Sequence, residues 1–279
     1  MLPRAGASSN YFPGLVAVLR RSAAQLVRSP SHSRRAEAAR RSARHVVQLT
    51  AILGAAIIAL MYFLDATEIG WMPTRGTPSL WPIRILTDFG KSRYVLWVLA
   101  GLLCVVAFIS PALRGQARSL LLGLGTRLQF VFLAVLVPAL IGEVLKWAVG
   151  RGRPFVGGED NVFNFRHFGG TEAFASFPSG HANTAFALAF AVSALWPQAR
   201  PVMIAYAIAI ALSRLVLLAH HPSDVVAGAM VGVIGAMAVR YWFAARRLGF
   251  AIRGDGAIVP LPGPSLGHLK RVAGGASAP

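Results

Sequence analysis

Six long apolar segments, separated by polar stretches, make up most of the middle of this chain. A helix needs about 20 mainly apolar residues to cross the roughly 30 Å hydrocarbon core of a bilayer. The segments run over Val46–Leu64, Tyr94–Leu113, Leu120–Leu145, Ala182–Trp196, Val202–Ala219 and Val225–Phe243, of which the fourth is the shortest. The pattern predicts an all-α, polytopic membrane protein with six transmembrane helices packed as a bundle.

Composition supports this class. Of the 279 residues, 55% are hydrophobic and only 14% are charged, which is too apolar for a soluble domain of this length. The sole cysteine, Cys104, lies inside an apolar segment, so no intrachain disulfide is possible. Cysteine pairing therefore gives no information on the compartment.

The net charge of +18 is strongest at the N-terminus, where residues 1–45 are rich in arginine and hold one acid, Glu37. A basic segment beside a membrane helix is typical of a cytoplasmic flank attracted to anionic lipid head groups. We favour this interpretation over nucleic-acid binding, and an organellar transit peptide is a minor alternative. The chain then divides into a basic cytoplasmic segment (1–45), a six-span domain (46–247) and a cytoplasmic tail (248–279) whose Pro and Gly content predicts disorder.

The distribution of Lys and Arg also predicts an orientation. With the N-terminus in the cytoplasm, most of the basic residues outside the apolar segments fall on the cytoplasmic side, so both termini are expected inside. The opposite face then receives the ends of the third and fifth segments and the starts of the fourth and sixth. We expect one pocket there, formed by Lys146, Arg153, Ser179, Gly180, His181, Arg214, His220 and Asp224.

Ionisable groups at membrane depth are costly, so this polar set predicts a functional site. Several cations converging at a membrane surface suit a phosphate group, because Arg binds two oxygens in a fork and Lys acts as a point charge. Ser179 and Gly180 precede the fourth segment, where free backbone N–H groups favour an anion. Ser179 as a simple N-cap is an equally good interpretation of that residue alone.

The two histidines suggest separate roles. His220 and Asp224 are four residues apart, so the carboxylate can accept a hydrogen bond from one imidazole nitrogen while the other attacks phosphorus. His181, from another helix, would protonate the leaving oxygen and later activate water. The alternative is that His220, His221 and Asp224 only form a polar helix start at the membrane surface. Glu143, three residues before Lys146, is expected to pair with that lysine.

Three motifs occur in order along the chain. They are Lys146 with Arg153-Pro154 after six residues, then Pro178-Ser179-Gly180-His181, then Ser213-Arg214, five residues, His220, three residues and Asp224. Together they resemble the three signatures of the type 2 phosphatidic acid phosphatase (PAP2) superfamily over about residues 45 to 243. Arg151 has no motif role, and His221 stands where many members have Trp.

The resemblance implies a role for each motif residue. His220 resembles the nucleophile that forms a phosphohistidine, Asp224 the residue that orients it, and His181 the general acid. Lys146, Arg153, Ser179, Gly180 and Arg214 resemble the phosphate-binding residues. The resemblance implies no metal or other cofactor, because cationic side chains neutralise the phosphate.

We therefore expect a metal-independent lipid phosphatase of a bacterial cytoplasmic (inner) membrane, with its active site on the periplasmic face. The candidate substrates are phosphatidylglycerol phosphate, phosphatidate, a polyprenyl diphosphate and the phosphates of lipid A. The expected partners are the membrane and a lipid phosphate, with no nucleic acid and no protein partner predicted. The alternatives are a lipid phosphotransferase, a vanadate haloperoxidase, whose known members are soluble, and a non-catalytic transporter or scaffold.

Overall fold

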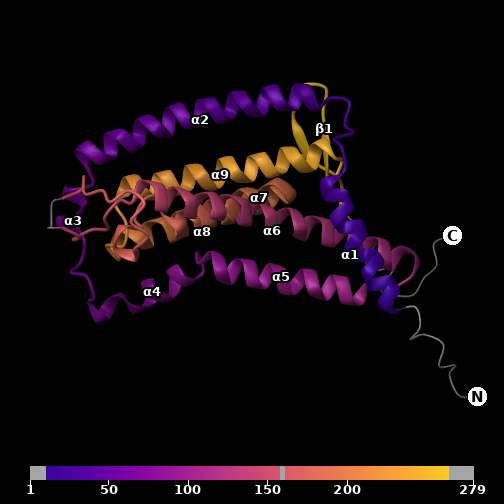
Figure 1. The fold of residues 1–279 in the computed structure, drawn as a ribbon, viewed down its shortest axis with the longest axis horizontal. Helices are drawn as coiled ribbons and strands as arrows, with labels where there is room; N and C mark the ends of the chain where they lie inside the picture. Colours follow the sequence, from indigo (N-terminus) through magenta and orange to yellow (C-terminus); the bar gives the residue numbers. More distant parts are fainter. Residues whose placement is uncertain (1–10, 158–160, 264–279) are drawn as a thin grey trace, which may run out of the picture.

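The computed structural model describes residues 11–157 and 161–263, and Figure 1 shows their arrangement. The helices are α1 (Tyr11–Val27), α2 (Arg35–Phe63), α3 (Thr67–Trp71), α4 (Trp81–Asp88), α5 (Ser92–Ile109), α6 (Gly115–Val149), α7 (Gly180–Leu195), α8 (Arg200–Val216) and α9 (Pro222–Ala245). Two short strands follow, β1 (Phe250–Ile252) and β2 (Ile258–Pro260). The predicted all-α class is confirmed, with a small β-hairpin added.

Helix α9 is the centre of the bundle and packs against α7, α2 and α6 (Figure 1). Glycines on α9 permit the close approach of α7. A Cβ atom at Gly228 would overlap the carbonyl oxygen of Ser179, and one at Gly232 would overlap that of Asn183. Small residues allow helix backbones to approach closely in membranes. This packing fixes the start of α7 beside the start of α9.

Five helical stretches in the described part of the chain are long and apolar enough to cross a membrane. They are Arg35–Phe63, Pro78–Ile109, Gly115–Val149, Pro197–Val216 and Pro222–Ala245. The remaining predicted span, the fourth (Ala182–Trp196), corresponds to α7, an apolar helix of 16 residues. At about 1.5 Å per residue, α7 is about 24 Å long and therefore shorter than the hydrocarbon core.

The expectation of a disordered tail is wrong for residues 250–260. These residues form an antiparallel hairpin in which Phe250 pairs with Pro260. Phe250 is buried, and its ring centroid lies 4.8 Å from that of Phe130 on α6. The hairpin therefore covers the end of the apolar core, which the Pro and Gly content of the tail did not indicate. The expected disorder of residues 264–279 concerns a range outside the described residues.

Candidate functional site

The predicted site residues meet at the end of the bundle opposite the hairpin (Figure 1). Lys146 lies in the last turn of α6, Ser179 immediately precedes α7, and Arg214 lies in the last turn of α8. A backbone hydrogen bond joins the start of α7 to the start of α9, because the Ser179 N–H donates to the carbonyl oxygen of Asp224 at 2.9 Å. The Lys146 ammonium group lies 3.1 Å from where a Cβ atom on Gly180 would stand, so a side chain there would crowd it.

His220 lies in the short connection between α8 and α9 and is buried. Its Nδ1 atom lies 2.8 Å from the carbonyl oxygen of Ser176. A carbonyl can only accept a hydrogen bond, so Nδ1 carries the proton and Nε2 keeps a free lone pair. This is the tautomer that nucleophilic attack through Nε2 requires.

The predicted hydrogen bond from His220 to Asp224 is not formed. The Nδ1 atom of His220 lies 4.0 Å from Oδ2 of Asp224, beyond hydrogen-bonding distance. That oxygen instead accepts from the Ser176 hydroxyl at 2.6 Å and from the His221 backbone N–H at 2.9 Å. Asp224 is the third residue of α9, where a carboxylate turns back to the helix start. Ser176 therefore connects Asp224 to His220.

The surroundings keep His220 neutral. Burial, together with the positive charges of Arg153 and Arg214, holds the pKa of the His220 imidazole well below its ordinary value of 6.5. Both effects disfavour the imidazolium form. At neutral pH the ring is unprotonated at Nε2 and is available as a nucleophile.

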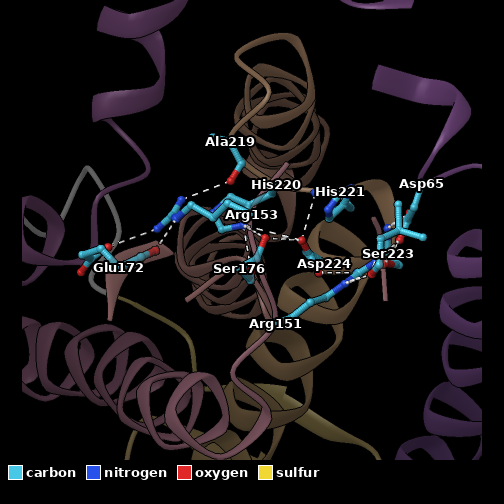
Figure 2. A network of polar contacts seen from close by, with 11 residues as sticks. Asp65, Arg151, Arg153, Glu172, Ser176, Ala219, His220, His221, Ser223 and Asp224 are labelled. Atoms are coloured by element: carbon cyan, nitrogen blue, oxygen red, sulfur yellow. Dashed lines mark hydrogen bonds and ion pairs between the residues drawn. The ribbon is translucent and has the colours of Figure 1, made fainter. Parts of the chain in front are cut away.

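Three cations surround the site in different ways. Lys146 pairs with Glu143 at 2.5 Å, which confirms the predicted contact. Arg153 donates from Nη1 to the carbonyl oxygen of Ala219 at 3.1 Å, and its Nη2 lies 3.3 Å from the exposed carboxylate of Glu172 (Figure 2). Arg214 donates from Nη1 to the Thr87 hydroxyl at 2.7 Å. The backbone and side chains thus fix the two guanidinium groups beside His220.

Several polar atoms of the predicted site are buried without a hydrogen-bond partner among the described residues. They include Oγ of Ser179, Nε2 of His181 and Nε of Arg214. Such atoms cost about 1–3 kcal/mol each when nothing satisfies them, so native proteins rarely keep them without a reason. The Ser179 hydroxyl makes no capping bond to α7, so the simple N-cap interpretation does not account for it. The three atoms are suited to hold the oxygens of a ligand.

Two residues that received no role in the sequence analysis lie in this site. Ser176 contacts both His220 and Asp224, as described above. Arg151 is fully buried and donates from Nη1 to Oδ1 of Asp224 at 2.7 Å (Figure 2). The sequence places Arg151 in the same Gly-rich stretch as Arg153, and only the fold separates the buried arginine from the one that faces the histidine.

No cluster of three or more His, Cys, Asp or Glu side chains with the geometry of a metal site occurs within residues 11–157 and 161–263. Positive charge near His220 comes from Lys146, Arg153 and Arg214. The arrangement places a neutral imidazole beside fixed positive charges, which suits transfer of a phosphoryl group.

Comparison with known proteins gives concordant matches. The model of the PAP2 superfamily matches residues 127–248. A lipid A 1-phosphatase of Rhizobium johnstonii is 32% identical over 181 residues, which cover 62% of this chain and 71% of that protein. A lipid A 1-phosphatase of Rhizobium etli is 34% identical over 157 residues, which cover 53% of this chain and 64% of that protein. No solved structure matches the chain.

Proposed function

Because this chain belongs to the PAP2 superfamily and is a membrane lipid phosphatase, we propose that it removes a phosphate group from lipid A through a phosphohistidine at His220. Its similarity to two lipid A 1-phosphatases favours this lipid over phosphatidylglycerol phosphate, phosphatidate and polyprenyl diphosphates. The observation that carries the mechanism is the neutral, buried His220 beside unsatisfied donors on Ser179 and Arg214.

In the first step, Arg153, Arg214 and Lys146 bind the phosphate oxygens and the α7 start adds backbone N–H groups. The lone pair on Nε2 of His220 attacks phosphorus, the P–N bond forms, and the bond from phosphorus to the sugar oxygen breaks. His181 is protonated when the negatively charged phosphate is bound, gives this proton to the leaving oxygen and becomes neutral. The fixed cations stabilise the negative charge of the transition state without moving.

In the second step, water replaces the dephosphorylated lipid. His181 takes a proton from the water as its oxygen attacks phosphorus, and the P–N bond breaks. Inorganic phosphate leaves, and Nε2 of His220 regains its lone pair. Gly180 leaves room for the phosphate beside Lys146, because any side chain at that position would contact the ammonium group.

An apolar groove beside the site suits the acyl chains of an amphiphile. It has a volume of about 770 Å³ and is lined by residues of α4, α5, α7 and α8, among them Val95, Leu188 and Met203. Asp88 also lines the groove and pairs with Lys91 at 2.6 Å. A Cβ atom on the nearby Gly90 would lie 3.4 Å from the His181 ring, so the groove begins close to the site.

We further propose that α7 crosses as a sixth span inside the bundle, that both termini are cytoplasmic, and that the site faces the periplasm of a bacterial inner membrane. The hairpin end supports this orientation because it carries Arg41, Arg127 and Arg246. Residues 46–247 would form the catalytic domain. A reporter fused after Pro279 should register as cytoplasmic and one inserted after Gly157 as periplasmic, and the reverse result would place the site in the cytosol.

The deciding experiment measures phosphate release from lipid A by the detergent-purified protein without added metal. The same assay covers phosphatidylglycerol phosphate, phosphatidate and a polyprenyl diphosphate, beside H220A and H181A. Release from lipid A that both substitutions abolish supports the proposal. Phosphate release from only one of the other lipids would show that lipid A is not the substrate. Activity that survives in H220A would contradict the phosphohistidine mechanism. Phosphate found on an acceptor lipid would indicate a phosphotransferase.

A further inference from the structure

A buried charged cluster lies on the far side of Asp224 from Ser176 (Figure 2). It joins Asp65, directly after α2, to Arg151, after α6, and to Ser223 and Asp224, at the start of α9. The side chains of Asp65, Arg151 and Asp224 are 0% exposed. A cluster of full charges removed from solvent costs several kcal/mol per ion unless every partner is in place.

The guanidinium group of Arg151 uses all of its donors. Nε and Nη2 donate to the carbonyl oxygen of Val162 at 3.1 and 2.9 Å. Nη1 donates to the Ser223 hydroxyl at 2.6 Å and to Oδ1 of Asp224 at 2.7 Å. Nη2 also donates to Oδ2 of Asp65 at 2.8 Å. No donor remains for a ligand, so Arg151 is not part of the phosphate-binding group.

Asp65 completes the cluster from a helix outside the motifs. Its Oδ1 accepts from the Ser223 backbone N–H at 3.0 Å, and its Oδ2 accepts from the Ser223 hydroxyl as well as from Arg151. A carboxylate near the first N–H groups of a helix is favourable. Asp65 therefore caps the start of α9 from beyond the end of α2.

We propose that Asp65 and Arg151 are positioning residues that hold Asp224, and through Ser176 the His220 ring, in the reactive geometry. This inference rests on the proposed phosphohistidine mechanism. Arg151 fixes one oxygen of Asp224, and the Ser176 hydroxyl and the His221 N–H fix the other. The carbonyl oxygen of Ser176 then holds Nδ1 of His220.

The negative charge of Asp65 also has a role in the proposed reaction. Arg151 alone would neutralise Asp224, whereas Asp65, Arg151 and Asp224 together carry one net negative charge. Positive charge develops on the His220 ring as Nε2 bonds to phosphorus, and a nearby negative charge stabilises it. Removal of the Asp65 charge should slow the chemical step, while the groups that bind phosphate are unchanged.

The test compares D65N and the milder S223A with the wild type in steady-state phosphate release from the lipid substrate, together with their thermal unfolding. We expect kcat of D65N to fall about 10- to 100-fold, the range for a lost hydrogen bond to a charged group, with KM within about twofold. S223A should lower kcat by a smaller factor than D65N does. Because S223A removes no charge, we expect it to fold even if D65N does not. The double variant D65N/R151Q should lose less than the product of its single losses, because both act through Asp224.

The matched control is D255N, since Asp255 pairs with Arg41 at 2.9 Å on the hairpin, at the other end of the bundle. D255N should keep wild-type kcat and KM. Folded D65N and S223A with wild-type kcat, or a rise in KM at unchanged kcat, would overturn the positioning role. An inactive wild type, or an active H220A, would instead overturn the proposed mechanism, so the two failures are distinct.

Discussion

Two buried arginines near His220 differ in what surrounds them. Every N–H of Arg151 has a protein partner, and two carboxylates lie within 2.8 Å of its guanidinium nitrogens. Arg214 is almost as buried, but its one hydrogen bond to a side chain goes to the neutral Thr87, and its Nε has no partner in the part of the chain that the structure describes. One arginine is balanced by the protein, and the other keeps its charge for a ligand.

This difference distinguishes an arginine that stabilises the fold from one that is available to bind a ligand. A satisfied ion cluster fixes the ends of α2, α6 and α9, whereas an unsatisfied cation on α8 raises the free energy of the empty site until an anion arrives. Removal of the charge should therefore lower mainly stability at Arg151 and mainly activity at Arg214.

The largest effect is expected for R151Q. Loss of the guanidinium leaves the carboxylates of Asp65 and Asp224 buried without their counter-charge, which should lower the free energy of unfolding by about 3–5 kcal/mol. Denaturation of the purified protein in detergent measures this change. R41Q, which breaks the exposed pair with Asp255, should change stability by at most about 1 kcal/mol. Equal effects of R151Q and R41Q would contradict the distinction.

A smaller effect, in activity and not in stability, is expected for R214Q. The phosphate loses one of its fixed cations, so kcat/KM should fall about 100-fold while the unfolding transition stays near that of the wild type. Steady-state kinetics and thermal unfolding of the same preparation provide both values. Strong destabilisation with normal kcat/KM in the surviving folded protein would reverse the assignment of Arg214.

The sequence predicted the phosphate-binding residues better than the buried cluster of Asp65, Arg151 and Asp224. Lys146, Arg153 and Arg214 stand in local motifs at helix ends, and the apolar pattern was enough to bring those ends together. Asp65 gave no such signal, because its partner Arg151 is 86 residues away and belongs to a loop whose path the sequence does not define. Long-range pairing of single polar residues depends on the packed fold, not on local spacing.

Helix lengths show the same contrast. Each of the six apolar segments has most of its residues in one helix. However, α2 begins at Arg35, well before the predicted start at Val46, because the basic stretch before it is also helical. Hydropathy detects the portion of a helix that suits lipid and not its polar extension. The predicted hydrogen bond from His220 to Asp224 is not formed because side chains at i,i+4 spacing face each other only within one helix, and His220 lies before α9 begins.

The smallest effect concerns the pH dependence of activity and tests the influence of Arg214 on His220. Burial, Arg153 and Arg214 lower the pKa of His220 well below 6.5, so the nucleophile should stay neutral as pH falls from 7.5 to 6.0. In R214Q one of these positive charges is gone, the pKa of His220 should rise toward 6.5, and more of the imidazole should be protonated at pH 6.0. The ratio of wild-type to R214Q kcat/KM should therefore increase over this range by at most about fourfold. Even a group of pKa 6.5 is about three-quarters protonated at pH 6.0, and burial and Arg153 still lower the pKa of His220 in R214Q. Ionisation of the substrate cancels in this ratio, and a ratio that does not change with pH would show that Arg214 does not control the charge of His220.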